Sequence, residues 1–319
     1  MLNDFVKYSR FCAVLSVLCL FISSCTSYEK ALWDAVENQE VGNVERLLER
    51  GADPEKLPKG KSQTLIEVAA RKGDPEIVKM LLEKGVHPDS ARGSETPLWL
   101  AMVNGNELAA IELVDAGANI EGPKREGFSP FYFAVMEDYL DLVTKMVAHK
   151  VDIHSEGPAG SPAHEAAENG NFEMLQLLSM NGADMNRINT DGESPIFLAF
   201  DAGKYEAAQW MMENGAVLKG ANILGNTVLT NMAEKNDTVA LRILCGADAA
   251  PNTRNRVGES ALHRAAALGH LEAAKILVNE CQAKINLRDN RGLSPAGLAF
   301  REGQTDLVDY LTSAGGRLR

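Results

Sequence analysis

The most constraining feature of this 319-residue sequence is a pattern that returns every 32 to 34 residues. Each copy begins with Thr or Ser, often followed by Pro, and most copies reach one Gly and, twelve residues later, a second Gly. Ser161-Pro162, for example, leads to Gly170 and Gly182. Clear copies begin at residues 64, 96, 129, 161, 194, 227, 260 and 294. A period of this length predicts a row of like units, each packed mainly on its neighbours.

Each copy predicts two helices and a turn. Ser or Thr can cap the free amides at the start of a helix, and Pro fits the first helical position. The first Gly ends a short helix, after which apolar residues such as Ile77, Met80 and Leu81 recur at helical spacing. The second Gly ends this longer helix. Turn residues follow, as at 186–192, and predict a projecting two-stranded finger.

These residues resemble the ankyrin-repeat family, whose signature is a Thr-Pro-Leu-His-x-Ala-Ala step and a later Gly-Ala-Asp-x-Asn. Ser161-Pro162-Ala163-His164-Glu165-Ala166-Ala167 carries the step clearly. The resemblance implies an all-α solenoid of helix-turn-helix repeats with projecting β-hairpin or turn fingers. With a weaker copy near residue 30, it covers about nine repeats over residues 30–319. It also implies that His164 and His263 brace neighbouring turns. The sequence departs from the pattern at Asp138 and Asn236, where Gly should end the short helix, and at Gly246, which comes two residues early.

The N-terminus has the features of an export signal. Lys7 and Arg10 precede an uncharged run over residues 11–22, which is shorter than a membrane span. The run ends in Ile22-Ser23-Ser24-Cys25, which resembles a bacterial lipobox. This implies a signal peptide over 1–24, lipidation of Cys25 and a tether over 25–29. Ordinary cleavage after Ser24 with a free Cys25 is the alternative. Thr26 after the cysteine favours a bacterial envelope protein held in the outer membrane and facing the periplasm.

Charge and motifs argue against nucleic-acid binding and familiar catalysis. The net charge of −12 repels a phosphate backbone, so we expect no nucleic acid partner. His164-Glu165 begins like a zinc-protease helix, but Glu168 stands where the second His is needed. No phosphate-binding glycine loop or nucleophile elbow occurs in the sequence. We therefore expect no catalytic residue, no metal and no cofactor, with an enzyme of unfamiliar site as the remaining alternative.

Two cysteines of the repeat region leave a question open. Cys245 and Cys281 could pair in an oxidising compartment. They lie near the ends of different repeats, however, and a bridge needs Cα atoms within about 7 Å. Two separately buried thiols are the alternative.

The resemblance implies a concave surface lined by the residue before each two-alanine step. In two consecutive repeats this position is apolar, and further apolar residues lie close to it in sequence. We predict a protein-binding patch made of Leu100, Val103, Phe128, Phe133 and Met136. Apolar groups gathered at a surface usually mark an interface. If the register slips locally, the same residues belong to the core instead.

The C-terminal third adds a basic strip. It consists of Arg254, Arg256, Arg264, Arg288 and Arg291. One interpretation is a second contact for an acidic partner. The other is a set of solvated pairs with nearby Glu259 and Asp289, each worth little.

These features favour a non-catalytic adaptor or scaffold. We expect a monomer that binds an unidentified, membrane-proximal protein through its concave face and contacts the membrane through its lipid anchor. A periplasmic inhibitor or immunity protein that blocks a toxin or hydrolase is the alternative function.

Overall fold

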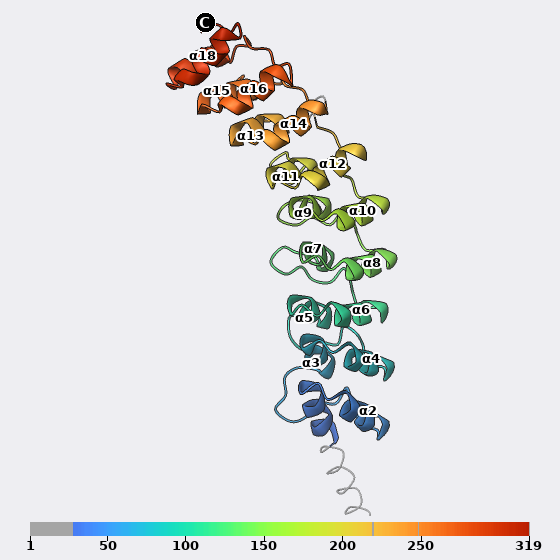
Figure 1. Cartoon of the computed structure of the whole chain (residues 1–319). Helices are drawn as coiled ribbons and strands as arrows, with labels where there is room; N and C mark the ends of the chain where they lie inside the picture. The colour runs from blue at the N-terminus through green and yellow to red at the C-terminus, as the bar shows by residue number, and fades with distance from the viewer. Residues whose placement is uncertain (1–27, 219, 248, 319) are drawn as a thin grey trace, which may run out of the picture. The chain divides into compact units, whose positions relative to one another are not determined.

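The computed structural model describes residues 28–218, 220–247 and 249–318, which fold as short helices joined by turns (Figure 1). The predicted signal peptide, the lipobox and Cys25 lie outside the described residues. Residues 28–37 are helical, so Tyr28 and Glu29 at the end of the expected tether already belong to the first helix. Within the described ranges there is no β-strand and only isolated bridges are found, such as that between Ala221 and Thr227. The predicted all-α fold is confirmed.

The helices form two compact units. The first contains residues up to Ala134 together with Tyr139–Asp152. Its helices after residue 37 are α2 (Val41–Glu49), α3 (Leu65–Lys72), α4 (Pro75–Glu83), α5 (Pro97–Val103), α6 (Glu107–Asp115), α7 (Pro130–Met136) and α8 (Leu140–Ala148). The last two residues of α7 group with the second unit. The first helix of one repeat packs on the first helix of the next, as α3 does on α5. The second helices do the same, since α4 packs on α6 and α6 on α8.

The second unit contains Val135–Asp138 and Ile153–Arg319. Its helices are α9 (Pro162–Asn169), α10 (Phe172–Met180), α11 (Pro195–Asp201), α12 (Tyr205–Glu213), α13 (Val228–Lys235), α14 (Thr238–Gly246), α15 (Ala261–Leu268), α16 (Leu271–Asn279), α17 (Pro295–Arg301) and α18 (Thr305–Ser313). The first helices of the repeats pack in the order α9, α11, α13, α15, α17. The second helices α10 and α12 pack together, as do α14, α16 and α18.

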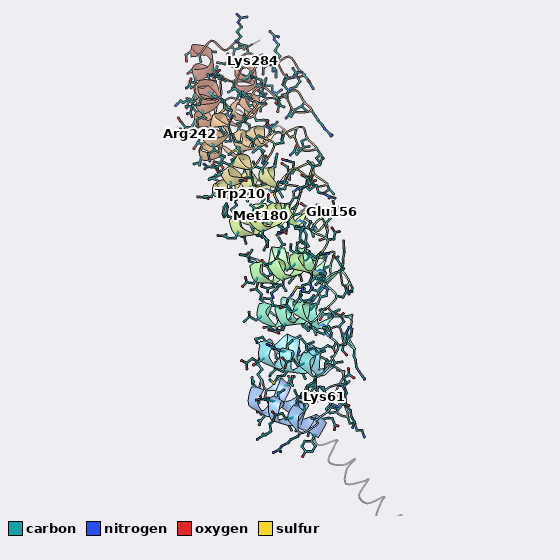
Figure 2. The ribbon with its side chains drawn as sticks, turned by 90° about the vertical axis from the view of Figure 1, so that its right-hand side faces the viewer. Lys61, Glu156, Met180, Trp210, Arg242 and Lys284 are labelled. Atoms are coloured by element: carbon teal, nitrogen blue, oxygen red, sulfur yellow. A yellow bond between two sulfur atoms is a disulfide. The ribbon has the colours of Figure 1, made fainter. Side chains whose placement is uncertain are left out.

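Paired alanines let neighbouring helices approach closely. Ala69 and Ala70 of α3 are almost fully buried, and so are Ala166 and Ala167 of α9. A larger core lies around them, in which Leu81 and Leu113 are fully enclosed. At the edge of the first unit, the Lys61 ammonium lies 3.2 Å from the centroid of the Trp33 ring (Lys61 is labelled in Figure 2). A cation over an aromatic ring is a favourable contact, and this one stabilises the N-terminal end of the first unit.

The first helices begin at the predicted caps. The Thr64 hydroxyl accepts a hydrogen bond from the Glu67 amide, and the Glu67 carboxylate accepts one from the Thr64 amide. At Ser161 a histidine takes the place of the glutamate. His164 Nδ1 accepts from the Ser161 amide at 3.0 Å, and Nε2 faces the carbonyl of Glu193 at 2.9 Å. Because a carbonyl only accepts, Nε2 carries the proton.

His263 repeats this arrangement between Ser260 and the carbonyl of Leu293. Both histidines therefore join the start of their own helix to the next finger, as the family resemblance implied.

Two short helices end without glycine. Asp138 and Asn236 adopt left-handed backbone angles, with φ of 61° and 56°. Gly73, Gly170 and Gly269 take that conformation at the equivalent point of other repeats. Asp and Asn tolerate it better than most residues with a Cβ, so these departures leave the repeat intact.

The fingers are turns rather than the β-hairpins that we predicted as one form. In the second unit, the finger before α9 closes through backbone hydrogen bonds between Gly157 and Gly160, and the fingers before α11, α13, α15 and α17 close on a side-chain oxygen. Asn189 Oδ1 accepts from the amides of Asp191 and Glu193, both at 2.9 Å. Asn222, Asn255 and Asp289 form the same loop in the following repeats. Because these oxygens satisfy amides that a strand ladder would otherwise pair, the chain turns instead of extending.

The asparagine amides also join consecutive fingers. Asn189 Nδ2 donates to the Ala159 carbonyl at 3.1 Å, Asn222 Nδ2 to Glu193 Oε1 at 3.4 Å, and Asn255 Nδ2 to Asn226 Oδ1 at 3.0 Å. Asp289 has no such donor. Arg291 replaces it by bridging Asp289 and Glu259, a residue of the preceding finger.

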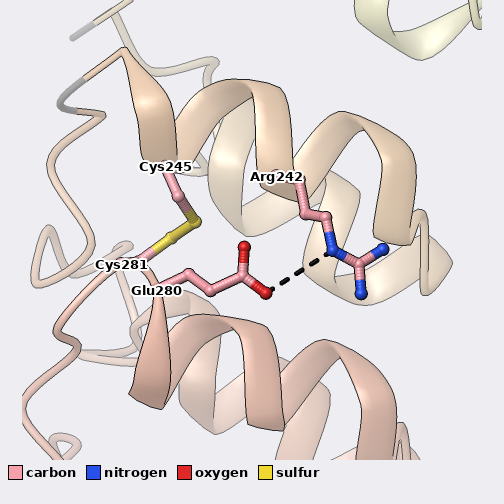
Figure 3. Close-up of a disulfide and its surroundings, with 4 residues drawn as sticks. All are labelled: Arg242, Cys245, Glu280 and Cys281. Carbon is pink, nitrogen blue, oxygen red and sulfur yellow. Dashed lines mark ion pairs between the residues drawn. A yellow bond between two sulfur atoms is a disulfide. The ribbon is translucent and has the colours of Figure 1, made fainter.

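The question left open for the two cysteines is decided by a disulfide between Cys245 and Cys281, with Cα atoms 4.7 Å apart (Figure 3). The alternative of two separate thiols is wrong. Cys245 is the penultimate residue of α14, and Cys281 follows α16 by two residues. Because α14 and α16 pack side by side, ends that are 36 residues apart in sequence become neighbours. Arg242 Nε lies 3.5 Å from Glu280 Oε1 beside the bridge.

Candidate protein-binding surface

Two hollows open between consecutive fingers of the first unit. One has a volume of about 270 Å³ and is lined by Ser62, Gln63, Glu67, Arg92, Gly93, Ser94, Glu95 and Leu100. The other has a volume of about 330 Å³ and is lined by Ser94, Glu95, Trp99, Pro123, Lys124, Arg125 and Glu126. Ser94 and Glu95 belong to both, so the finger that precedes α5 separates two adjoining depressions.

The first hollow has a fixed carboxylate in its wall. Glu67 is 1% exposed and accepts hydrogen bonds from the Thr64 amide at 2.6 Å and the Gly93 amide at 3.2 Å. Thr64 Oγ1 in turn donates to the Ser90 carbonyl at 2.7 Å. Because the carboxylate is occupied by backbone donors, it holds the finger in place rather than serving as a base.

The second hollow is built on Trp99, which occupies the histidine position of the repeat. Its Nε1 donates to the Pro123 carbonyl at 2.8 Å, so it braces the next finger as His164 does in its own repeat. Arg125 pairs with Glu95 at 2.7 Å across this hollow. Phe133 meets Trp99 edge to face, with ring centroids 5.2 Å apart. The walls are therefore held by an indole, an ion pair and an aromatic contact.

The structure brings together part of the predicted apolar patch. Val103 is 37% exposed, and Phe128 and Phe133 are half-buried. Phe128 also packs on Tyr132, with ring centroids 5.8 Å apart. Phe133 adjoins the second hollow through its contact with Trp99, and Val103 and Phe128 add partly accessible apolar surface on α5 and before α7.

Leu100 and Met136 differ from the expectation. Leu100 is only 7% exposed, so its predicted exposure is wrong. It faces the layer between α3 and α5, which pack closely, and reaches only the wall of the first hollow. Met136 is half-buried and belongs to the part of α7 that groups with the second unit. Sequence reasoning missed Trp99, Glu95 and Arg125, although a tryptophan at the usual histidine position was a usable signal.

In the predicted basic strip, two arginines are tied to buried carboxylates. Arg264 pairs with Glu234 at 2.5 Å and with Glu259 at 3.3 Å. Arg291 pairs with Glu259 at 2.8 Å and with Asp289 at 2.7 Å. Glu259 and Asp289 are 6% and 5% exposed. Buried carboxylates need such partners, so these arginines maintain the fold.

The same network sets the charge of Asp289. Burial alone would raise the pKa of Asp289, but hydrogen bonds from the Leu293 amide and from Arg291 hold that pKa below its ordinary value. The remaining arginines of the strip are more available. Arg254 donates to the Arg288 carbonyl at 2.9 Å, and Arg254, Arg256 and Arg288 are all exposed.

The buried histidines are structural. Burial lowers the pKa of both His164 and His263, so both are neutral near pH 7. Over the described ranges, no group of three or more His, Cys, Asp or Glu is placed to hold a metal ion. None of the described helices combines the length and the hydrophobicity that a bilayer crossing needs.

Comparison with known proteins agrees with this architecture. A family model described as ankyrin repeats (3 copies) matches residues 65–157, 163–253 and 229–318. The chain belongs to the ankyrin-repeat family. Ankyrin repeats bind protein partners and are typically non-catalytic, so the family supports an interaction role.

Several curated relatives share part of the chain. The probable 26S proteasome regulatory subunit p28 of Saccharomyces cerevisiae is 29% identical over 50% of this chain and 72% of its own length. The ankyrin repeat and KH domain-containing protein mask-1 of Caenorhabditis elegans is 30% identical over 47% of this chain and 6% of its own. The B-cell lymphoma 3 protein homolog of Mus musculus is 28% identical over 49% of this chain and 36% of its own. The chain thus spans less than two thirds of the last two relatives.

Proposed function

We propose that this ankyrin-repeat protein is a non-catalytic adaptor that is anchored to the bacterial envelope and binds one protein partner at the finger side of α5 and α7. The observation that carries the proposal is the pair of adjoining hollows, which share Ser94 and Glu95, together with the half-buried Phe133 that packs on Trp99 of the second hollow. Partly exposed aromatic and arginine side chains around a depression are the usual components of a protein-binding hot spot.

The walls suggest how a partner is recognised. Phe133 and Phe128 offer partly accessible ring surface, whereas Glu95 and Arg125 offer one charge of each sign 2.7 Å apart. A loop with an apolar tip and a flanking polar group would fill one hollow and displace little structure. Because the ion pair and the Trp99 hydrogen bond already fix the walls, binding orders few side chains, and a preordered surface loses less entropy on association.

Anchoring through Cys25 is the second part of the proposal. It is supported by the sequence Ile22-Ser23-Ser24-Cys25 after a short apolar run. The first described helix begins at residue 28, only three residues beyond the cysteine, so a lipid at Cys25 would hold the repeats within about 10 Å of the membrane surface. The partner is then a membrane-proximal envelope protein, and the expected compartment is the periplasm, with attachment to the outer membrane.

The binding surface is tested by photocrosslinking in intact cells. A photoreactive amino acid at Val103 should capture one dominant partner, since this side chain is 37% exposed on α5, the helix that contributes Leu100 and Trp99 to the two hollows. The matched control is Leu108, which is 62% exposed on the second helix of the same repeat and should not give that adduct. The same adduct at both positions, or none at Val103, would contradict the assigned surface. A captured toxin or hydrolase whose activity falls on binding would instead identify an inhibitor.

The anchor is tested separately. Cys25→Ala should abolish incorporation of a radiolabelled fatty acid and release the protein from the membrane fraction. Retained label in this variant would refute lipidation at Cys25 and leave the protein-binding proposal standing.

A further inference from the structure

The second helices of the second unit carry an apolar surface that the stacking of repeats leaves uncovered. Met180 is 80% exposed at the end of α10, and Phe172 is 38% exposed at its start. Leu177 of α10 and Trp210 of α12 are half-buried. We call Phe172, Leu177, Met180 and Trp210 the second-helix patch. Met180 and Trp210 are labelled in Figure 2, in which the side of the molecule that carries α10 and α12 faces the viewer.

Helical spacing explains why these residues are not core. Met174, Leu175 and Leu178 turn inward and are fully buried. At about 100° per residue, Met180 lies on the opposite side of α10, with Phe172 and Leu177 on either flank of it. Sequence reasoning about the concave face could not find these residues, because they lie on the other helix of each repeat.

An aromatic contact joins the patch across two repeats. Phe172 and Trp210 meet edge to face, with ring centroids 5.5 Å apart and planes at 84°. The contact bridges α10 and α12 and fixes both rings, yet it leaves the Phe172 ring partly accessible. A partner would therefore meet a rigid aromatic pair and, at the other end of α10, a flexible methionine. Methionine adapts to irregular apolar surfaces, which suits a docking role.

Acidic residues lie among these apolar side chains. Glu173, Glu206 and Glu213 are exposed on α10 and α12, beside the uncharged Gln176 and Gln209. Among the described residues none of these three glutamates forms an ion pair; Glu213 accepts a hydrogen bond from Gln209 at 3.4 Å. Arg242 of α14, also labelled in Figure 2, is engaged by Glu280.

From the uncovered apolar side chains and the exposed glutamates among them, we infer that the second-helix patch binds a basic amphipathic helix of a partner protein. The apolar side of such a helix covers Phe172, Met180 and Trp210, while its flanking Lys or Arg residues meet Glu173, Glu206 and Glu213. A second copy of this chain would bring the same glutamates together, and like charges at an interface oppose association. An anionic lipid surface is repelled for the same reason. The second-helix patch shares no residue with the two hollows, so it adds a second partner segment to the proposed adaptor.

The test uses the full chain in nanodiscs of zwitterionic phosphatidylcholine, with empty nanodiscs as the blank. The probe is a fluorescein-labelled 15-residue helical peptide with leucines along one side and lysines flanking them. A second peptide has glutamate in place of every lysine. Fluorescence anisotropy should show that the lysine peptide binds at least tenfold more tightly than the glutamate peptide. Equal binding of the two peptides, or no binding of either, would overturn the inference.

Three variants locate the binding. Met180→Lys should weaken the lysine peptide at least tenfold without a change in melting temperature, because the side chain is 80% exposed. Leu108→Lys, a matched change at an exposed position of α6, should bind as the parent does. Glu173→Lys combined with Glu206→Lys should reverse the preference in favour of the glutamate peptide. Unchanged binding by Met180→Lys, or an unchanged preference in the double variant, would show that the peptide binds elsewhere. Neither result depends on the Val103 crosslink, so the two proposals fail independently.

Discussion

Removing the disulfide should weaken the C-terminal repeats more than any single surface change. The bridge closes a loop of 36 residues between Cys245 and Cys281. In the chain-entropy treatment, a loop of this length restricts the unfolded chain by about 4 kcal/mol at 25 °C. Cys245→Ala combined with Cys281→Ala should lose most of that free energy of unfolding, since the alanines leave the packing of α14 on α16 unchanged.

The assay is urea unfolding followed by circular dichroism, together with amide hydrogen exchange. Because repeat units open locally, exchange should accelerate most at amides from α14 to α16. Reductant should weaken the parent protein to the level of the double variant and should not affect the variant itself.

A matched control separates the bridge from the ion pair beside it. Arg242→Ala removes the ion pair with Glu280. Because both side chains of this pair are about half-exposed, the loss should lower the free energy of unfolding by no more than about 0.5 kcal/mol. If the double variant unfolds at the same urea concentration as the oxidised parent, the entropic reasoning is refuted. Alkylation of both thiols in the untreated native protein would refute the bridge itself.

Three further outcomes are expected. Trp99→Phe should lower the free energy of unfolding by about 1 kcal/mol, because the Pro123 carbonyl loses its hydrogen-bond donor. An unchanged free energy of unfolding in a urea titration would contradict this prediction. Asn236→Ala should cost about 1 kcal/mol in the same assay, whereas Asn236→Gly should be neutral or stabilising, since the backbone there is left-handed. Burial lowers the pKa of His164 and His263, so the unfolded chain binds protons more readily than the folded chain. The free energy of unfolding should therefore fall as the pH drops below about 6.5, by at most about 1.4 kcal/mol per pH unit for each histidine. A variant with both histidines changed to glutamine should lose this pH dependence.

The local rules of the repeat could be predicted well from sequence. Thr64, Thr96 and Ser294 cap their helices as expected, because a hydroxyl followed by a helix-compatible residue leaves few alternatives. Asp138 and Asn236 were recognised as departures from glycine, and the structure gives them the same backbone sign. Features that depend on the neighbour one residue away in sequence, or one turn away on a helix, are visible in a single sequence.

Features that depend on the neighbouring repeat were harder to predict. Pairing of Cys245 with Cys281 depends on how the ends of α14 and α16 lie side by side, which their spacing in sequence does not reveal. Leu100 looked exposed by register, yet the close approach of α3 and α5 encloses it. The role of Arg291 required knowing that Glu259 of the previous finger is buried within reach.

The fingers of the second unit also bear on how such arrays grow by duplication. Repeats that close on Asn222 or Asn255 bring their own donor and can follow many neighbours. A repeat that closes on Asp289 needs Arg291, and that arginine needs a carboxylate such as Glu259 in the unit before it. If the last repeat followed a unit without that carboxylate, Arg291 would lose one of its two anionic partners. Engineered or natural shuffling of this array should therefore transfer the last two units together, as a pair with a fixed order.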